Sequence, residues 1–250
     1  MTRTVSDVVV EALKRHGVEV IFGQSIPSAV LLAAERAGIR QVMYRTENAG
    51  GAMADGYART SNKLGVVAAQ NGPAATLLVP PLTEAMLVSV PIVALVQDVP
   101  TPVQDRNAFQ ELDHVTLFAG CSKWTRRLTD PARADEYVER AMTHAMSGRP
   151  GPAVLLLPKD GLITEVPSER PARSSSFSHT PIDRPVPARP ALSSAARLLA
   201  NAKQPVVLAG GGVHGSHAAN ALALLQETAS LPVGTPNMGK GAVSEPHPLS

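Results

Sequence analysis

One acidic side chain stands where a carboxylate could take part in chemistry. Glu47 follows the apolar run Ile39–Tyr44 and opens a segment rich in small residues that ends at Arg59. Thr46 is suited to be a helix N-cap, which places Glu47 in the first helical turn, at the carboxyl end of a predicted parallel strand. That edge is where open α/β sheets bind ligands. A carboxylate there also complements the helix dipole, and position alone favours this structural role.

A glycine pattern in the last third of the chain is a second candidate site. Gly210, Gly212 and Gly215 follow the apolar run Pro205–Ala209 with the spacing of a dinucleotide-binding fingerprint. Three glycines are a weak signal, and the acid expected at the end of a second strand is missing, because Glu227 falls inside the next predicted helix. The pattern therefore disfavours a nicotinamide cofactor.

The elements that would position these residues alternate along the chain. A first helix is predicted after Thr4, which forms a capping-box pattern with Asp7, and Gly17 supplies a stop. The intervals that follow are long enough for crossover helices between parallel strands. Short apolar runs typical of buried strands lie at Val18–Phe22, Ile39–Tyr44, Leu64–Ala69, Ile92–Val96 and Ala153–Leu157.

This alternation predicts an α/β fold whose parallel sheet has helices on both faces. We assign residues 1–160 to this first domain and the proline-rich residues 161–190 to an interdomain linker. Residues 191–250 restart the α/β pattern but hold too few elements for a doubly wound domain, so a partial second domain is expected. Its predicted elements are helix Ala191–Ala202, strand Pro205–Ala209, helix Ser216–Ala229 and an extended stretch near Pro232–Thr235.

Composition narrows the classes of function. The formal net charge is only +2, and the arginines are not interleaved with aromatic residues that could stack on bases, which disfavours nucleic acid as a partner. The longest apolar stretch contains Ser89 and Pro91 and is shorter than the ~20 residues that span a bilayer, so no membrane segment is predicted. A single cysteine, Cys121, and an N-terminus without a signal-type stretch give the cytoplasm as the default location.

Several motifs together resemble the acetolactate synthases and their thiamine-diphosphate-dependent relatives. Thr46-Glu47-Asn48 with Ala54-Asp55-Gly56-Tyr57-Ala58-Arg59 is similar to the glutamate motif of this family. The resemblance covers nearly the whole chain and identifies a pyrimidine-binding domain followed by part of a central domain. Further similar segments are Phe22-Gly23, Asn71-Gly72-Pro73-Ala74-Ala75-Thr76, Ala108-Phe109-Gln110-Glu111, Ser147–Pro152, Pro158-Lys159-Asp160, Ala209–Gly212 and Met238–Gly241.

The resemblance implies a catalytic role for the carboxylate. Glu47 would bond to the aminopyrimidine ring of thiamine diphosphate and stabilise the imino tautomer that takes the thiazolium C2 proton, while the cofactor does the organic chemistry. Gly23, Gly72, Pro73 and Thr76 would line the cofactor. The implied activity is decarboxylation and carboligation of a small 2-oxo acid, as in acetolactate synthase large subunits.

Three further residues resemble positions on the substrate side of the cofactor or near it. Phe109 and Gln110 fall in the substrate-side segment, and ordinary loop packing explains them equally well. Lys123 corresponds to a lysine near the substrate channel, with a solvated surface lysine as an equal alternative. His114 could act as a proton donor or a substrate contact, but a lone histidine is more often structural.

The glycine turn has a second interpretation within the resemblance. In flavin-containing relatives the turn that corresponds to Gly210, Gly211 and Gly212 lies by the FAD phosphates, where backbone amides can approach an anion. Other relatives keep the turn without a flavin. FAD is therefore a second cofactor hypothesis beside thiamine diphosphate.

The sequence also departs from the family near the implied active site. Residues Gln24–Ser28 replace the usual Pro-Gly-Gly, and Thr46 and Asn48 stand where His and Gln are typical. These departures leave the substrate open, with simple decarboxylation of another 2-oxo acid or cleavage of an acyl-CoA as alternatives.

The segment that grips the diphosphate is not recognisable in these residues. Family members hold Mg²⁺ and the diphosphate through Gly-Asp-Gly and a later Asn in a third domain, and Lys159-Asp160-Gly161 is only a distant echo. Mg²⁺ needs oxygen ligands in near-octahedral geometry, so no metal site is predicted here. The missing domain would hold the Mg²⁺, and the chain would be inactive without it.

Three functional hypotheses follow. The favoured one is the N-terminal part of a carboligase, acting as a homo-oligomer such as a dimer, or with a complementary chain that carries the diphosphate-binding domain. The small-residue helix Ala49–Ala58 is its candidate subunit interface. The others are a catalytically silent, truncated relative that acts as an interaction partner, and a flavin- or dinucleotide-binding module that uses the Gly210 turn.

Overall fold

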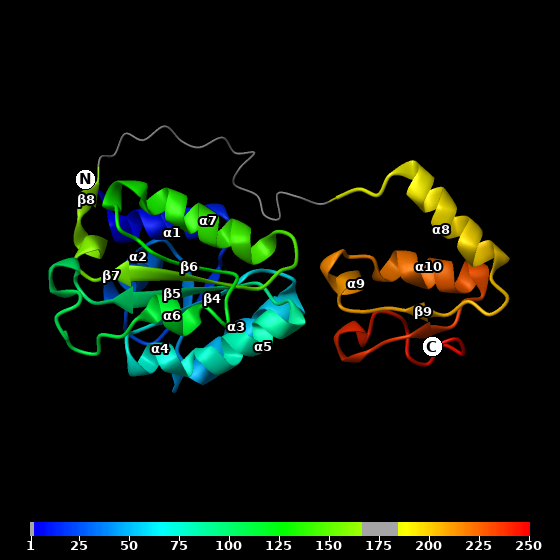
Figure 1. The fold of residues 1–250 in the computed structure, drawn as a ribbon, viewed down its shortest axis with the longest axis horizontal. Helices are drawn as coiled ribbons and strands as arrows, with labels where there is room; N and C mark the ends of the chain where they lie inside the picture. Colours follow the sequence, from blue (N-terminus) through cyan, green and yellow to red (C-terminus); the bar gives the residue numbers. More distant parts are fainter. Residues whose placement is uncertain (1–2, 167–184) are drawn as a thin grey trace. The chain divides into compact units, whose positions relative to one another are not determined.

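The computed structural model describes residues 3–166 and 185–250, which form two compact units (Figure 1). Most of the predicted linker, residues 161–190, lies outside the described residues. The start of that range folds with the first unit, as the 3₁₀ turn η3 (Gly161–Ile163) and strand β8 (Glu165–Val166). Strand β8 pairs antiparallel with β1 (Arg3–Thr4), so the first and last described residues of this unit lie side by side.

Six parallel strands form the sheet of the first unit, in the order β3-β2-β4-β5-β7-β6. Five of them coincide with the apolar runs seen in the sequence. The sixth, β6, was not predicted, because an edge strand is not buried on both faces and its two arginines break the apolar pattern. The bounds are β2 Val20–Phe22, β3 Arg40–Val42, β4 Gly65–Ala69, β5 Ile92–Asp98, β6 Trp124–Arg127 and β7 Pro152–Pro158.

Helices cover both faces of this sheet, which confirms the predicted α/β class (Figure 1). One face carries α1 (Val5–Arg15), α2 (Ser28–Arg36) and α7 (Ala134–Met146). The opposite face carries α3 (Glu47–Ser61), α4 (Pro73–Leu77), α5 (Val79–Val88) and α6 (His114–Phe118). Two short 3₁₀ turns, η1 (Thr101–Val103) and η2 (Pro131–Arg133), lie in the connections.

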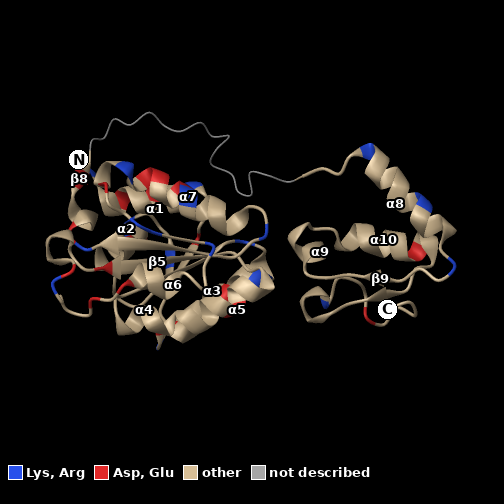
Figure 2. Cartoon of the chain, in the orientation of Figure 1, with Lys and Arg blue, Asp and Glu red and all other residues tan. Residues whose placement is uncertain are grey.

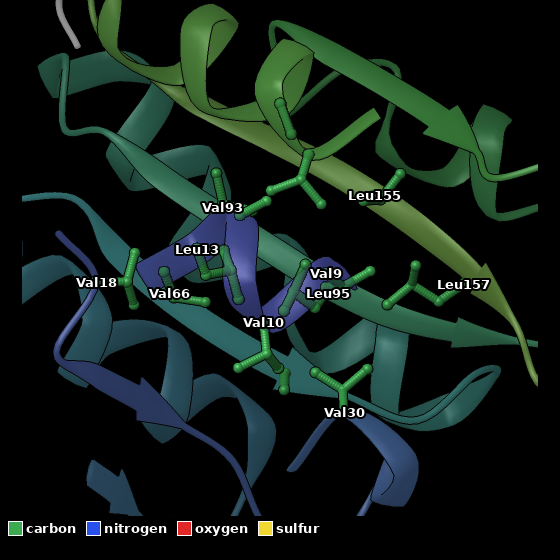
Figure 3. Close-up of a cluster of buried hydrophobic side chains, with 14 of the residues drawn as sticks. Val9, Val10, Leu13, Val18, Val30, Val66, Val93, Leu95, Leu155 and Leu157 are labelled. Atoms are coloured by element: carbon green, nitrogen blue, oxygen red, sulfur yellow. The ribbon is translucent and has the colours of Figure 1, made fainter. Parts of the chain in front are cut away.

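The central strands separate two hydrophobic cores. Successive side chains of a strand point to opposite faces, so Val93 and Leu95 of β5 enter one core while Ala94 and Val96 enter the other. Figure 3 shows the first core, where valine and leucine side chains of β4, β5 and β7 meet those of α1. All seven residues of β5 and of β7 are buried, as expected for strands covered on both sides.

Local signals place the first helix where the sequence predicts it. The Thr4 hydroxyl accepts the Asp7 backbone N–H at 3.4 Å, and the Asp7 carboxylate accepts the Thr4 backbone N–H at 3.0 Å. This reciprocal capping box satisfies two amides that the helix leaves free. Beyond the helix, Gly17 has φ of 77°, a left-handed conformation that glycine adopts without strain.

Basic residues and acidic residues are both scattered along the helices and loops of the first unit (Figure 2). On one face, Arg15 of α1 reaches α7 and forms ion pairs of 2.6 Å with both Asp135 and Glu139. The pairs tie two helices that are far apart in the sequence onto the same side of the sheet.

The small residues of α3 are used for close packing inside the first unit. A Cβ at Gly51 would overlap the Pro81 ring, and a Cβ at Gly65 of β4 would overlap the Ala54 carbonyl oxygen. Glycine and alanine therefore let α3 approach both α5 and β4 closely.

The second unit contains a small parallel ladder of two strands, β9 (Val207–Leu208) and β10 (Val233–Gly234). Its core consists of Ala209, Val233, Ala242 and Val243. The other elements are α8 (Arg189–Asn201), α9 (Gly212–Gly215), α10 (Ala219–Ala229) and η5 (Asn237–Gly239). Across the described parts of both units, every helix is too short or too polar to cross a membrane.

Candidate active site

The candidate residues lie on loops at the carboxyl ends of four neighbouring strands. Gly23 follows β2, Glu47 comes after β3, Gly72 comes after β4, and Asp98 is the last residue of β5. Because the strands are parallel and adjacent in the sheet, these loops share one edge. The structure thus brings Glu47, Gly23 and Gly72 to the same edge, which we call the carboxyl edge.

Glu47 is the first residue of α3, and its side chain is partly exposed. Thr46 occupies the N-cap position in an extended conformation, as its residue type predicted. Its hydroxyl donates to Asn48 Oδ1 at 2.6 Å, and the same oxygen accepts the Ala49 backbone N–H at 2.9 Å. An acidic side chain in the first turn complements the helix dipole, and a partly exposed carboxyl group can accept a hydrogen bond from a ligand.

Tyr44 anchors the segment that leads into Glu47. Its buried hydroxyl donates a 2.7 Å hydrogen bond to the Ala68 carbonyl oxygen of β4. Its ring packs so tightly on α3 that a Cβ at Gly50 would overlap it. Burial raises the pKa of the Tyr44 hydroxyl, and the negative charge of Glu47 raises it further, so Tyr44 stays a neutral donor.

The turn at Gly72 requires glycine for two reasons. Its φ of 63° and ψ of −124° lie in a region that other residues rarely adopt. A Cβ at Gly72 would also lie 2.7 Å from the Cβ and the carbonyl oxygen of Gln110. Pro73 follows as the first residue of α4, where its missing N–H costs no helical hydrogen bond, and Thr76 lies exposed one turn later with its hydroxyl bonded to the Pro73 carbonyl at 2.6 Å.

A second loop is fastened against this turn. The Asn71 side-chain amide donates to the carbonyl oxygens of Phe109 and Gln110, both at 3.0 Å. The Gln70 side chain donates to Gln110 Oε1 at 2.9 Å. The Phe109 ring is 78% exposed, so packing within the described residues does not account for it. Phe109 and Gln110 are therefore presented beside the Gly72 turn at the carboxyl edge.

Glu111 holds the preceding part of the same loop. Its carboxylate accepts the Asp105 N–H at 2.6 Å and the Ala108 N–H at 2.9 Å. The hydrogen bonds from the Ala108 and Asp105 amides lower the pKa of the Glu111 carboxyl. This carboxylate consequently has a structural use, because it fixes the loop that carries Phe109 and Gln110.

A buried polar chain lies behind the Gly72 turn. The Gly72 backbone N–H donates to His114 Nε2 at 2.9 Å, and His114 Nδ1 lies 3.2 Å from Asp98 Oδ1. The other Asp98 oxygen accepts a 2.6 Å hydrogen bond from Arg127 Nε. Burial opposes ionisation of Asp98, but the hydrogen bonds from His114 and Arg127 and the charge of Arg127 hold the pKa of this carboxyl below its usual value.

Lys123 lies at the opposite edge of the sheet. It precedes β6, beside the first residue of β7, and its backbone N–H donates to the Pro152 carbonyl at 2.8 Å. Its ammonium group donates to the carbonyl oxygens of His144 and Ser147 at the C-terminus of α7, where a cation complements the helix dipole. These contacts hold the Lys123 ammonium group away from the carboxyl edge of its own domain. A substrate-side role for Lys123 stays a prediction.

The glycine turn of the second unit connects β9 to α9. A Cβ at Gly211 would lie 3.1 Å from the Met238 carbonyl oxygen, and a Cβ at Gly239 would overlap the Ala209 carbonyl. The Gly210–Gly212 turn therefore packs against the Met238–Gly241 segment. Whether the turn binds FAD stays a prediction.

The metal-ligating residue types are dispersed. Within residues 3–166 and 185–250, no group of three His, Cys, Asp or Glu side chains is arranged to hold a metal ion. Asp160 belongs to Lys159-Asp160-Gly161, which only distantly resembles Gly-Asp-Gly. Its carboxylate accepts the Thr101 N–H at 2.9 Å and so fixes a loop.

Sequence reasoning missed three residues of the carboxyl edge. In the sequence Tyr44 is only the last residue of an apolar run, and nothing local shows that its hydroxyl bonds to Ala68. Asp98 directly follows a run of buried residues, and an acid at that position was an available signal. Arg127 lies on β6, which the residue pattern did not predict.

Comparison with known proteins gives two family matches. The family described as "Thiamine pyrophosphate enzyme, N-terminal TPP binding domain" matches residues 3–117. The family described as "Thiamine pyrophosphate enzyme, central domain" matches residues 192–250.

Individual relatives agree with these matches. A "Probable acetolactate synthase large subunit" of Methanocaldococcus jannaschii is 36% identical over 98% of the chain and 42% of its own length. An "Acetolactate synthase" of Arthrospira platensis is 36% identical over 96% of the chain and 43% of its own length. A "Sulfoacetaldehyde acetyltransferase" of Rhodobacter capsulatus is 32% identical over 100% of the chain and 41% of its own length. The chain thus spans about two fifths of the length of the curated relatives it matches.

Proposed function

The chain belongs to the thiamine pyrophosphate enzyme family, and from this premise we propose that it supplies the pyrimidine-binding side of an active site that acts on a small 2-oxo acid. The observation that carries the proposal is the position of Glu47, a partly exposed carboxylate at the start of α3 on the edge that also holds Gly23 and Gly72.

The residues at this edge fit the pyrimidine part of thiamine diphosphate. The carboxyl group of Glu47 offers an acceptor for a ring N–H. Gly72 carries no side chain, so the loop that presents Gln110 can lie directly against the turn at this edge. When bound, the cofactor would supply a nucleophilic carbon and a ring that can act as the electron sink for decarboxylation.

The chain's own contribution is to hold a proton and to orient groups. Glu47 accepts a hydrogen bond from the ring and thereby favours the tautomer that can remove a proton. Tyr44 fixes the segment before Glu47, and its neutral hydroxyl adds no competing charge. Gln110 and the exposed Phe109 ring face the substrate side in this proposal, where an amide can bond to a carboxylate or carbonyl oxygen.

The diphosphate and its Mg²⁺ need ligands beyond the carboxyl edge. We propose that a diphosphate-binding segment outside these 250 residues supplies them, either in a longer polypeptide or on a complementary chain. Two subunits would then complete one site, with Glu47 on one and the diphosphate ligands on the other. The greater length of the curated relatives supports this proposal.

Decarboxylating carboligation is the reaction that we propose. Two of the relatives named above are acetolactate synthases, and a third is a sulfoacetaldehyde acetyltransferase, so pyruvate is the first substrate to test and sulfoacetaldehyde the second. A flavin at the Gly210 turn is a separate proposal, which visible flavin absorbance in the purified protein would support.

Isotope-labelled chain titrated with thiamine diphosphate and Mg²⁺ tests the proposal directly. We expect the backbone amide signals of Glu47 and Gly72 to shift in NMR spectra, whereas that of Lys123 at the opposite edge stays unchanged. Mixing the chain with a candidate diphosphate-binding partner should then give CO₂ release from pyruvate that depends on the cofactor. Shifts that are absent from the carboxyl edge would contradict the assignment of this site.

A further inference from the structure

His114 is a buried, titratable side chain that the proposed mechanism does not use. It is the first residue of α6, and its side chain is 0% exposed. Both ring nitrogens nevertheless have a partner, since Nε2 meets the Gly72 amide and Nδ1 faces Asp98. Hydrophobic packing alone does not explain a buried imidazole with two directed partners, one in the turn after β4 and the other at the end of β5.

The partners determine which nitrogen of His114 carries the proton. A backbone N–H can only donate, so Nε2 must accept from Gly72 and must lack a proton. A neutral imidazole then carries its proton on Nδ1, which faces the acceptor Asp98 Oδ1. The Nδ1–H tautomer therefore satisfies both contacts, and neither the other tautomer nor the imidazolium can accept from Gly72.

Asp98 and Arg127 stabilise this arrangement. Arg127 Nε donates to Asp98 Oδ2 at 2.6 Å, so the negative charge of the carboxylate is already balanced without a charge on His114. The Val99 backbone N–H also donates to Asp98 Oδ1, at 2.9 Å. The carboxylate can therefore accept from a neutral imidazole and hold its ring in one orientation.

The hydrogen bonds that run from Arg127 through Asp98 and His114 end at the Gly72 turn. The bond from Gly72 to His114 fixes a glycine whose backbone conformation few other residues adopt, on a turn that contacts Gln110. The Asn71 side chain adds two bonds to the same loop. The positions of Gly72 and Gln110 at the carboxyl edge thus depend on His114 from one side and on Asn71 from the other.

We propose that His114 is a positioning residue, which in its Nδ1–H tautomer holds the Gly72 turn and the Gln110 loop in the geometry that a ligand at the carboxyl edge requires. The proposal rests on the proposed function for the identity of that ligand, thiamine diphosphate. His114 itself touches neither the reacting atoms nor the cofactor in this proposal.

Three variants of the whole chain test the role. His114→Leu removes both bonds at similar volume. His114→Gln keeps an acceptor that can reach Gly72 and a donor that can reach Asp98. His144→Leu is the matched control, because that histidine stacks on Trp124 and lies at the C-terminal end of α7, away from the carboxyl edge.

The first measurement is the rate of backbone amide hydrogen exchange, followed by NMR. The rate at Gly72 is compared with the rate at Leu95 in the buried strand β5. In His114→Leu we expect exchange at Gly72 to become about tenfold faster relative to Leu95, the loss that one hydrogen bond explains. His114→Gln should recover most of the protection, and His144→Leu should leave the ratio unchanged. Equal acceleration at Gly72 and Leu95 in His114→Leu would overturn the proposal, because it would reveal only a loss of global stability.

Nitrogen-15 shifts of the imidazole give an independent readout. We expect the wild-type spectrum to report a protonated Nδ1 and an unprotonated Nε2, and the reverse tautomer would overturn the proposal.

Titration of the same variants with thiamine diphosphate and Mg²⁺ links the role to the ligand. Apparent affinity should fall about tenfold in His114→Leu and recover in His114→Gln. Unchanged affinity in His114→Leu would overturn the positioning role. If wild-type chain shows no response to the cofactor, the proposed function fails, while the exchange ratio and the tautomer still decide whether His114 holds the Gly72 turn.

Discussion

The hydroxyl of Tyr44 donates a 2.7 Å hydrogen bond to the carbonyl oxygen of Ala68, so the segment that leads into Glu47 is fastened to strand β4. Strand β2 lies between β3 and β4 in the sheet, and the Tyr44 side chain reaches past it. The position of the carboxylate therefore depends on a tertiary bond as well as on the start of a helix.

Removing that hydroxyl should weaken the fold measurably. Tyr44→Phe removes the hydrogen bond that the buried Ala68 carbonyl accepts from this hydroxyl, and we expect the free energy of unfolding to fall by about 1–2 kcal/mol. Urea titration followed by circular dichroism measures it. Tyr137→Phe is the control, because the Tyr137 hydroxyl shares an exposed 3.1 Å hydrogen bond with Thr129 and its loss should cost less than about 0.5 kcal/mol. Equal effects of the two substitutions would contradict the importance of the Tyr44 bond.

Two glycines of α3 should respond to alanine in opposite directions. A Cβ at Gly50 would overlap the Tyr44 ring, whereas a Cβ at Gly56 meets nothing within 4 Å. We expect Gly50→Ala to destabilise the chain by about 1–3 kcal/mol through overpacking. Gly56→Ala should stabilise it by about 0.5–1 kcal/mol, because alanine loses less entropy in a helix. Thermal unfolding of both variants checks the contrast, and destabilisation by both would count against it.

Glu47→Gln tests the chemistry that we propose for the carboxyl edge. An amide cannot stabilise the proton-removing tautomer of the pyrimidine ring as a carboxylate does. We therefore expect cofactor-dependent CO₂ release in a reconstituted enzyme to fall by about 10²–10⁴-fold. Glu84→Gln is the control, since Glu84 is exposed on α5 and pairs only weakly, at 3.3 Å, with Arg59. Full activity in Glu47→Gln would remove the mechanism.

The buried carboxylate of Asp98 should leave a signature in acid. Hydrogen bonds from His114 and Arg127 outweigh burial and hold the folded-state pKa of Asp98 below the ordinary value of about 3.9. Its contribution to stability is therefore complete above about pH 4 and is lost as the pH falls through the folded-state pKa. We expect the destabilisation by Asp98→Asn to be largest near neutral pH and to shrink below about pH 4. Urea unfolding at several pH values measures this, and a difference that does not change with pH would contradict it.

Cys121 should be unreactive in the folded protein. Burial raises the pKa of its thiol to about 11, and the side chain is 3% exposed. We expect a chromogenic thiol reagent to modify it at least about a hundredfold more slowly than in the urea-unfolded chain, because the thiolate is the reacting form. The chain has one cysteine, so the absorbance change reports a single site. Rapid modification without denaturant would show that this part of the second core opens readily.

The alternation of apolar runs and longer intervals was enough to predict the α/β class and five strands of the main sheet. Strands such as β5 and β7 are buried on both faces, so they must be apolar throughout and stand out in the sequence. The edge strand β6 escaped because its arginines reach solvent or an acid on another element. Arg127 is an example, since its side chain pairs with Asp98 of β5, and β7 lies between these two strands.

Only part of the candidate site could be predicted from the sequence. Glu47, Gly72 and Gln110 belong to recognisable local motifs, and parallel strand ends gather such motifs at one edge. The contacts that fix them are long-range: Tyr44 bonds to Ala68, and His114 bonds to Gly72. No spacing rule predicts these pairings, because they depend on how whole elements pack.

The pairing of Arg3 with Val166 means that the described part of the first unit begins and finishes at neighbouring positions. A short linker between these two residues would tolerate a circular permutation, with new termini opened at Gly148, an exposed glycine between α7 and β7. Such a permutant would keep every strand of the main sheet in its place, and it would move the points for fusing another protein from the original ends to the new termini at Gly148.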